Sequence, residues 1–598
     1  MNYICYFKRS KKYLRHLIKE PVVKRWLYLG NNYDDLALIK EILGEEKQFK
    51  VGAAFHTVAN ATRARYIDYI ARLSKRHHTS RVWWASSLAS KSPYLSQLFK
   101  LICYQKLIGQ LMGENDGLVV LVSDAGFFRH LKNTSRLIGC RYLGGPGNLC
   151  AKMSIKSLLI RIKLAYYLAR HKFRVWNWPD GDLARAEILL FSWVQEHSFD
   201  KNNNYLDNTL GKLKEHLIKK GHNVKRFTYM SYYKLFFDRL KQSKEEMIID
   251  LKHVSFLDIF KAVLSVYAFK YDGNDTFDNL NISYLLKREI MIENANPDFF
   301  CNLVFYFGVK KIVRKAKAMQ FVVHPYEGQP WEKMLYIAVK NIKPSAKVIG
   351  YQHSAFSSFY MSHFLGEGES AYAPAPDLLL ANSVYNEERL IAGGFLKGKV
   401  KNIGALRYEY LFDRQLAEDT SAGNKNNSSI LICLPYDLGI AADMLISLMP
   451  YMTKLMRAGA ISGVLVKSHP LAPMNISDIE GGAEFLRYAR HISGQLGEVI
   501  AKVDIVIYCN GAVGVEAAFL GKNILKYLPE IEIDLDPLPF SRNVVTFSNG
   551  EFENAWVSLM SRDNNLIDSH NTSKQRQMLD QVNYGLIDEI FVNMGGGE

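Results

Sequence analysis

The 598-residue sequence lacks the features that mark several protein classes. Its seven cysteines are an odd number without a CxxC pair, which argues against a disulfide-stapled secreted domain and against a cysteine-based zinc site. No apolar run approaches the roughly 18 residues that a membrane-spanning helix needs. The richest stretches, Phe300–Val309 and Leu118–Val122, are too short. Basic residues follow the first Met with no apolar region behind them, so we expect no signal peptide and a cytoplasmic protein.

Acidic residues are scarce relative to basic ones. The chain has 76 Lys and Arg against 59 Asp and Glu, which gives a formal net charge of +17. Such an excess predicts an anionic partner: nucleic acid, an anionic membrane surface or a phosphorylated substrate. Because no zinc finger, RNP-like segment or KH-type loop is present, nucleic acid is the least favoured of the three. There is also no DxD triplet at a predicted strand end and no His/Cys cluster, so we expect no metal and no cofactor other than a substrate.

The segment 150–176 has no acidic residue at all. Its apolar positions include Leu158, Leu159, Ile162, Tyr166 and Leu168, and its basic ones include Lys152, Lys156, Arg161, Lys163, Arg170, Lys172 and Arg174. Trp176 and Trp178 stand at its end. This pattern predicts a basic amphipathic helix that lies in a membrane surface. The alternative is a basic helix packed on its domain with a solvated outer face.

Short apolar segments closed by small or polar residues recur along the chain and predict buried strands. They are 22–30, 50–58, 118–126, 186–194, 318–325, 346–353, 377–383, 399–407, 428–437, 460–470, 501–511 and 523–528. Helical patterns lie between them, for example at 92–112, 331–341 and 440–458. This alternation predicts an α/β protein with two doubly wound parallel sheets.

Breaks in this rhythm suggest the domain organisation. We predict an N-terminal domain over 1–360, with the basic helix at 150–180 and a helical insertion at 230–300. A C-terminal domain follows over 361–575, with a tail or helix at 576–598. The polar segment 419–429 is predicted to be a flexible loop.

The most suggestive polar cluster follows the predicted strand 501–511. Asn510, Gly511, Ala512 and Gly514 form a small-residue turn before a helix, where backbone N–H groups can approach an anion. Glu516 lies one turn further on, within reach of a ribose hydroxyl. The alternative is a tight corner in which the glycines serve packing.

A second cluster, Lys467, Ser468, His469 and Pro470, stands at another strand end. The first three can donate hydrogen bonds to phosphate, and the proline fixes the chain direction. The alternative is an ordinary strand terminus, since the same His-Pro dipeptide also occurs at 324–325.

Candidates for an acid or base lie in the first half of the chain. His353 follows a predicted strand, and Glu327 precedes a helix that starts near Pro330. Because only a short crossover separates them, we expect the two side chains on adjacent strand ends. Each has a structural alternative, a histidine satisfied by backbone groups and a carboxylate that complements a helix dipole. Asp207 begins a predicted helix over 207–220, where capping is the favoured role.

The order of these clusters resembles that of glycosyltransferases with the GT-B architecture. The similarity is closest to the group of sialyl-, polysialyl- and Kdo-transferases and CDP-glycerol glycerophosphotransferases. His469 and Pro470 match the HP motif of that group, and 510–514 match its Ser/Thr-rich turn, although the paired serines are absent here. The segments YEGQPWEKML, KVIGYQHSAFS, PDLLLANS and NIGALR look like bacterial surface-carbohydrate (capsule and O-antigen) biosynthesis proteins.

This resemblance implies two Rossmann-like domains that face each other across a cleft. The C-terminal domain would bind a nucleotide-activated donor and the N-terminal domain an acceptor, without a metal. Lys467, Ser468, His469, the turn 510–514 and Arg407 would take the charge of the leaving phosphate. His353 and Glu327, and less favourably Asp207, would be the base.

The implied reaction moves a CMP-activated nonulosonic or Kdo-type sugar onto a surface polysaccharide or a lipid-linked glycan. The enzyme would work at the inner face of the cytoplasmic membrane. A UDP- or GDP-sugar donor, a CDP-glycerol-type polyol-phosphate transferase and a non-catalytic scaffold of a glycan assembly complex stay open as alternatives.

Overall fold

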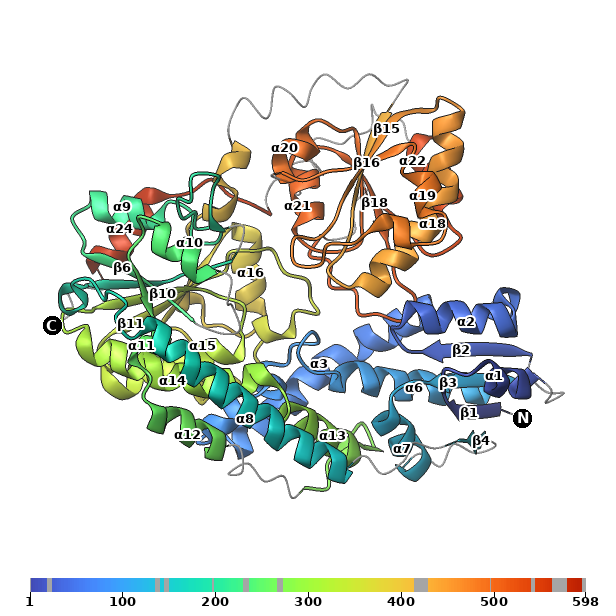
Figure 1. The fold of residues 1–598 in the computed structure, drawn as a ribbon, viewed down its shortest axis with the longest axis horizontal. Coiled ribbons are helices and arrows are strands. Elements are labelled where there is room, and N and C mark those ends of the chain that lie inside the picture. Colours follow the sequence, from blue (N-terminus) through green and yellow to red (C-terminus); the bar gives the residue numbers. More distant parts are fainter. Residues whose placement is uncertain are drawn as a thin grey trace.

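The computed structural model describes residues 2–18, 24–134, 140–144, 150–195, 198–229, 236–265, 273–412, 428–494, 496–538, 544–561 and 578–593. These residues form three parallel sheets and one small antiparallel hairpin, β8 (Thr276–Phe277) with β9 (Leu280–Asn281). The sheets define an N-terminal unit (2–143), a middle unit (183–412) and a C-terminal unit (428–561), shown in Figure 1.

The N-terminal unit has a four-stranded sheet in the order β2-β3-β1-β4. Its strands are β1 (Asn2–Tyr6), β2 (Arg25–Leu29), β3 (Leu118–Val122) and β4 (Cys140–Leu143). Its helices are α1 (Lys11–Ile18), α2 (Tyr33–Leu43), α3 (Gly52–Arg76), α4 (Arg81–Trp84), α5 (Ser87–Ser90), α6 (Leu98–Glu114) and α7 (Ala125–Thr134). We predicted two sheets, so this third sheet is a difference from the prediction.

The middle unit has a seven-stranded sheet in the order β13-β12-β11-β10-β5-β6-β7. Its strands are β5 (Ile188–Phe191), β6 (Val224–Thr228), β7 (Met247–Ile249), β10 (Phe321–Pro325), β11 (Lys347–Tyr351), β12 (Leu378–Ala381) and β13 (Val400–Asn402). The chain order reverses between β5 and β10. This is the topological switch point at which open α/β sheets bind ligands.

Helices cover this sheet and extend to the side. They are α8 (Cys150–Val175), α9 (Leu213–Lys219), α10 (Phe236–Gln242), α11 (Asp250–His253), α12 (Phe256–Ser265), α13 (Ser283–Glu293), α14 (Pro297–Lys315), α15 (Pro330–Ile342) and α16 (Val384–Ala392). Asn296 caps α14 by accepting from the N–H of Asp298, and Pro330 starts α15, where its missing N–H costs nothing.

The C-terminal unit repeats the same topology with the order β16-β15-β14-β17-β18-β19. Its strands are β14 (Ser428–Cys433), β15 (Ile461–Lys467), β16 (Ala489–His491), β17 (Ile505–Tyr508), β18 (Asn523–Tyr527) and β19 (Val544–Phe547). Its helices are α18 (Leu438–Arg457), α19 (Gly482–Phe485), α20 (Leu496–Ala501), α21 (Ala512–Phe519) and α22 (Phe552–Met560). Its switch point lies between β14 and β17.

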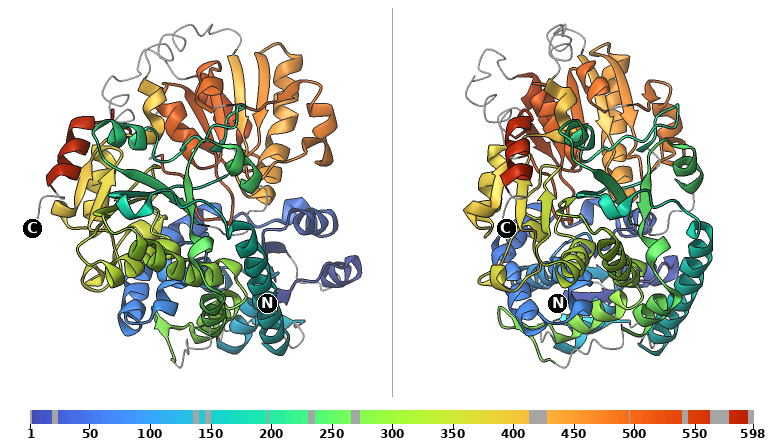
Figure 2. Two further views of the ribbon diagram at one scale, coloured as in Figure 1. Left: turned by 60° about the vertical axis from the view of Figure 1, so that its left-hand side comes forward. Right: turned by 90° about the vertical axis from the view of Figure 1, so that its left-hand side faces the viewer.

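The last helix, α24 (Tyr584–Asn593), returns to the middle unit (Figure 2). Ile587, Ile590 and Phe591 are buried there in one core with residues of β5, β10 and β11. Two Rossmann-type parallel sheets are the GT-B arrangement that we predicted, so the predicted fold class is confirmed.

Several sequence predictions differ from the structure. Segment 50–58 belongs to α3 and not to a strand, because Val51, Phe55, Val58 and Ala59 are buried with helical spacing. The predicted first domain ends at 360, whereas β12 and β13 continue its sheet to Asn402.

The predicted helical insertion 230–300 contributes β7 as an edge strand of the middle sheet. The helix predicted over 207–220 begins at Leu213. Residues 419–427 of the predicted flexible loop lie outside the described residues.

Candidate functional site

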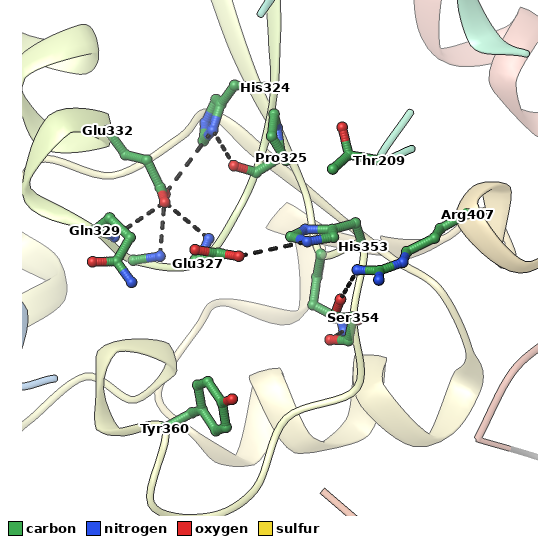
Figure 3. A network of polar contacts seen from close by, with 12 residues as sticks. Thr209, His324, Pro325, Glu327, Gln329, Glu332, His353, Ser354, Tyr360 and Arg407 are labelled. Carbon is green, nitrogen blue, oxygen red and sulfur yellow. Dashed lines mark hydrogen bonds and ion pairs between the residues drawn. The ribbon is translucent and has the colours of Figure 1, made fainter. Parts of the chain in front are cut away.

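Glu327 and His353 follow neighbouring parallel strands, β10 and β11, at the edge next to the switch point. His353 Nε2 lies 3.5 Å from Glu327 Oε1 (Figure 3). The His353 side chain is 6% exposed and that of Glu327 is 45% exposed. The structure therefore brings together the two acid–base candidates that the sequence placed on adjacent strand ends, with the carboxylate nearer to solvent.

The surroundings shift the two groups in opposite directions. Burial, with the positive charge of Arg407 and a smaller electrostatic effect of His363, holds the pKa of His353 well below its usual value, so the ring is neutral near pH 7. Its Nδ1 is buried and has no hydrogen-bond partner among the described residues. Removal from bulk water raises the pKa of Glu327, which Arg407 partly offsets. A neutral base beside a carboxyl of raised pKa is suited to proton transfer.

The backbone of the loop that carries Glu327 is held by Glu332, in the first turn of α15. Glu332 Oε1 accepts from the N–H groups of Glu327 (2.9 Å) and Gln329 (3.1 Å), and Oε2 accepts from that of Gly328 (3.1 Å), as Figure 3 shows. The Ser362 hydroxyl donates to the Glu327 carbonyl oxygen at 2.6 Å. Burial raises the pKa of Glu332 to about 8. These bonds fix the backbone beneath the Glu327 side chain.

Arg407 stands on the other side of His353, in the 3-10 segment η8 (Leu406–Phe412). Its guanidinium donates to Ser354 Oγ at 2.8 Å. Tyr408 makes the largest contribution to raising the pKa of Arg407, and burial opposes it. The carboxylates of Glu516 and Glu327 raise the pKa further. The predicted phosphate ligand is therefore a cation between carboxylates of two units.

The middle and C-terminal units meet at Glu516 in α21. The Tyr410 hydroxyl of η8 donates to Glu516 Oε2 at 2.7 Å. Glu516 is buried, and burial raises its pKa to about 7, which the bond from Tyr410 and the charge of Arg407 partly offset. The carboxylate predicted to bind a ribose is thus engaged by a residue of the middle unit.

Two glycines at the start of α21 have different roles: Gly511 is its N-cap residue, and Gly514 lies in its first turn. Gly511 has φ +96°, a conformation that L side chains rarely adopt, and open space lies where its Cβ would be. Gly514 is buried against the Tyr508 ring, which a Cβ would overlap. Gly514 therefore serves packing, which was the alternative considered for this turn. Gly511, Asn510 and Ala512 are partly buried, and they precede or begin α21.

The predicted phosphate donors after β15 make local contacts. Lys467 Nζ donates to the Gly494 carbonyl at 2.8 Å, and Ser468 Oγ lies 2.9 Å from His491 Nε2. The N–H of Leu471 donates to His469 Nδ1 at 3.2 Å, and Pro470 is exposed. These local hydrogen bonds agree with the alternative of an ordinary strand terminus.

Asp207 is occupied structurally. Its Oδ2 accepts from Ser192 Oγ at 2.7 Å, and its Oδ1 accepts from the N–H groups of Thr209 (3.0 Å) and Leu210 (2.9 Å). Its side chain is buried beside Arg226. We therefore assign Asp207 to the turn that precedes α9. It does not cap that helix, which begins at Leu213, so the capping role favoured from the sequence is wrong in detail.

Two tyrosines near the site were not predicted. Tyr94 of the N-terminal unit lies with its hydroxyl 3.2 Å from that of Tyr360. Although Tyr94 is half exposed, partial removal from bulk water raises its pKa, which the bond with Tyr360 lowers and the charges of Cys509 in the C-terminal unit and Glu327 in the middle unit raise. All three units therefore approach one another here. No local signal around Tyr94 indicates this placement.

A separate cavity of about 250 Å³ lies between the N-terminal and C-terminal units. Tyr33, Phe49, Asp443 and Glu530 are among its lining residues, and the predicted site residues are not. Within the described residues, no group of three or more His, Cys, Asp or Glu side chains is placed to hold a metal ion. No helix among them combines the length and apolar character needed to cross a bilayer.

No protein-family model matches the chain. A comparison with curated proteins found no match.

Solved structures that are similar include a Methanocaldococcus jannaschii UDP-GlcNAc 2-epimerase in complex with UDP-GlcNAc and UDP (10% identity, 68% of this chain and 99% of that chain, TM-score 0.40). Acinetobacter baumannii MurG (12%, 68% and 99%, TM-score 0.38) and S. aureus MnaA with UDP (12%, 68% and 97%, TM-score 0.38) are others.

Proposed function

We propose that this chain is a glycosyltransferase that uses a nucleotide-activated sugar. One observation carries the proposal: Arg407 lies between the carboxyl groups of Glu327 in the middle unit and Glu516 in the C-terminal unit, and Tyr410 joins these units by donating to Glu516. His353 pairs with Glu327 on the first side, and Gly511 precedes the N-terminus of α21 on the second. One unit thus offers a proton acceptor, and the other offers backbone N–H groups for an anion.

In the proposed reaction, an acceptor hydroxyl lies beside Glu327, the more exposed member of the pair. As its oxygen bonds to the anomeric carbon, its proton passes to the Glu327–His353 pair, and the bond from that carbon to the donor phosphate oxygen breaks. The nucleotide leaves with the electron pair of that bond. Arg407 and the N–H groups near Gly511 stabilise the charge that develops on it.

The donor in this proposal is a CMP-activated nonulosonic or Kdo-type sugar, and the acceptor is a surface polysaccharide or a lipid-linked glycan. Glu516, in the second turn of α21, would bind the ribose. This assignment rests on the sequence resemblance to CMP-sugar and CDP-glycerol transferases. It places the enzyme at the inner face of the cytoplasmic membrane, where such acceptors are assembled.

The test is a thermal-shift and calorimetric screen of the full chain against CMP, CDP, UDP and GDP. A ligand at about 100 times its Kd stabilises the native state by roughly 2.7 kcal/mol, which raises the melting temperature. We expect a selective response to CMP, followed by sugar transfer from a CMP-sugar. Selective CDP binding with phosphate in the product would favour polyol-phosphate transfer. Selective binding of UDP or GDP would indicate a UDP- or GDP-sugar donor in place of a CMP-sugar. A lack of response to all four nucleotides would contradict the proposal.

A further inference from the structure

The surface of α8 and α12 exposes a continuous set of large apolar side chains. Each is between 44 and 69% exposed, and together we call them the α8–α12 face: Leu159, Ile162, Tyr166, Phe173, Trp176, Phe256, Leu257, Phe260 and Leu264. Scattered exposed apolar residues are ordinary, whereas a patch built by two adjacent helices marks an interaction site.

The two helices lie side by side, as Figures 1 and 2 show. The rings of Phe173 and Phe256 are 5.5 Å apart. The opposite sides of the helices hold them in place: Leu168 and Ala262 are buried, and Arg161 Nε donates to the Asn294 carbonyl at 2.9 Å. The exposed side chains are therefore not needed to anchor either helix.

The charge on this face is of one sign. Lys163, Arg170 and Arg174 on α8 and Lys261 on α12 are exposed, and α8 contains no acidic residue. The one carboxylate of α12, Asp258, is buried and bonded to Ser255. An apolar face with cationic borders complements an anionic bilayer surface, where each basic residue contributes about 1 kcal/mol. A two-fold copy of this chain would instead bring like charges together.

We infer that the α8–α12 face docks on an anionic lipid bilayer, with the apolar side chains in the headgroup region. The face belongs to the same packed body as the candidate site: α8 packs on α14, α14 packs on α15, and α15 begins just after Glu327. Docking would therefore hold the acceptor side of the site at the membrane. It extends the proposed function but does not depend on it.

The structure changes which residues should be tested. Arg161, one of the basic residues of the predicted amphipathic helix, is buried and bonded, so its charge does not reach the surface. The side chains of Lys152 and Lys156 lie outside the described residues.

The experiment is co-sedimentation of the full chain with vesicles of phosphatidylcholine alone or mixed with phosphatidylglycerol. The charge variant is Lys163→Glu, Arg170→Glu and Arg174→Glu, and the apolar variant is Ile162→Ser, Phe173→Ser and Phe260→Ser. Matched controls are Lys397→Glu, Lys399→Glu and Lys401→Glu, and Val557→Ser, Met560→Ser and Val592→Ser, all exposed away from this face. Melting temperatures check that every variant folds.

We expect the unmodified chain and both controls to bind the anionic vesicles. Each lost cation should weaken this binding about fivefold, and the apolar variant should lose it even at low salt. Binding that both face variants retain would overturn the inference. So would a dimer in light scattering that the apolar variant dissociates while no vesicle binding occurs. Vesicle binding is measured without donor or transfer, so its failure is distinct from failure of the nucleotide screen.

Discussion

The buried carboxyl group of Glu332 accepts a hydrogen bond from the backbone N–H of Glu327 at 2.9 Å, and so a buried acid positions the loop that carries a half-exposed one. Glu332→Ala would leave three N–H donors of this loop unpaired, at about 1–3 kcal/mol each. We expect the free energy of unfolding to fall by about 3 kcal/mol or more, measured by urea denaturation. The exposed Glu388→Ala is the control and should change it by less than about 0.5 kcal/mol. Equal effects of the two would show that the Glu332 bonds carry no stability.

The Glu327–His353 pair should govern turnover. Glu327→Gln and His353→Ala should each lower kcat by about 10²–10⁴-fold, the usual range for general acid–base catalysis. Because both lie in the middle unit, nucleotide affinity should stay unchanged by calorimetry. The exposed Glu367→Gln and His78→Ala are controls of the same chemistry. Full activity in both site variants would mean that the base is elsewhere.

Arg407 is the cation best placed to meet a donor phosphate. A charge-assisted hydrogen bond contributes about 1.5–3 kcal/mol, so Arg407→Ala should raise the nucleotide Kd by roughly 10–100-fold. Arg185→Ala, at a largely exposed side chain, should leave the Kd unchanged. An unaltered Kd in Arg407→Ala, with the fold intact by melting, would limit Arg407 to its contact with Ser354.

Substitutions of Gly511 and Gly514 should affect different properties, nucleotide binding in the first case and core packing in the second. Gly511→Ala adds a methyl into open space but strains φ by about 1–2 kcal/mol, so we expect a weaker nucleotide-induced rise in melting temperature. Gly514→Ala overlaps the Tyr508 ring, and the chain without ligand should lose about 1–3 kcal/mol of stability. Identical behaviour of both variants in both measurements would reject this division of roles.

Glu516 should make stability depend on pH. Its carboxyl has a pKa of about 7 in the folded chain, against an ordinary value of 4.5. Between these values the folded state binds a proton that the unfolded state releases. The stabilisation is therefore complete below about pH 4.5 and is lost as pH rises through 7.

Glu516→Gln removes this titration. The free energy of unfolding should then fall less steeply between pH 5 and 8, by about 3 kcal/mol over the whole range. The exposed Glu498→Gln should retain the original slope. A variant slope equal to that of the unmodified chain would show that another buried group titrates there.

Local patterns were enough for most of the strands and for the acid–base pair. Glu327 and His353 follow apolar runs joined by one short crossover helix, α15, and such runs pair in parallel at neighbouring positions. The pattern around 50–58 misled because a short apolar segment can belong to a strand or to one face of a helix, and here only Val51, Phe55, Val58 and Ala59 are buried.

Other parts of the site depend on contacts between distant segments. Tyr94 lies 266 residues from Tyr360, and Tyr410 lies 106 residues from Glu516, so no spacing along the chain marks either pair. The different roles of Gly511 and Gly514 could not be predicted either. The sequence does not distinguish a glycine that leaves room for a ring from one that adopts a positive φ.

The sequence by itself determined the α/β class, the strand ends that carry Glu327, His353 and Gly511, and the cationic character of α8, since these follow from local periodicity and charge. Only the tertiary structure decided that strands β1 to β4 form a sheet of their own, and that Asp207 and Arg161 are buried and engaged in hydrogen bonds. It alone joined α8 with α12 into one exposed face. Burial and long-range pairing set these outcomes, and both depend on which segments pack together rather than on any one segment.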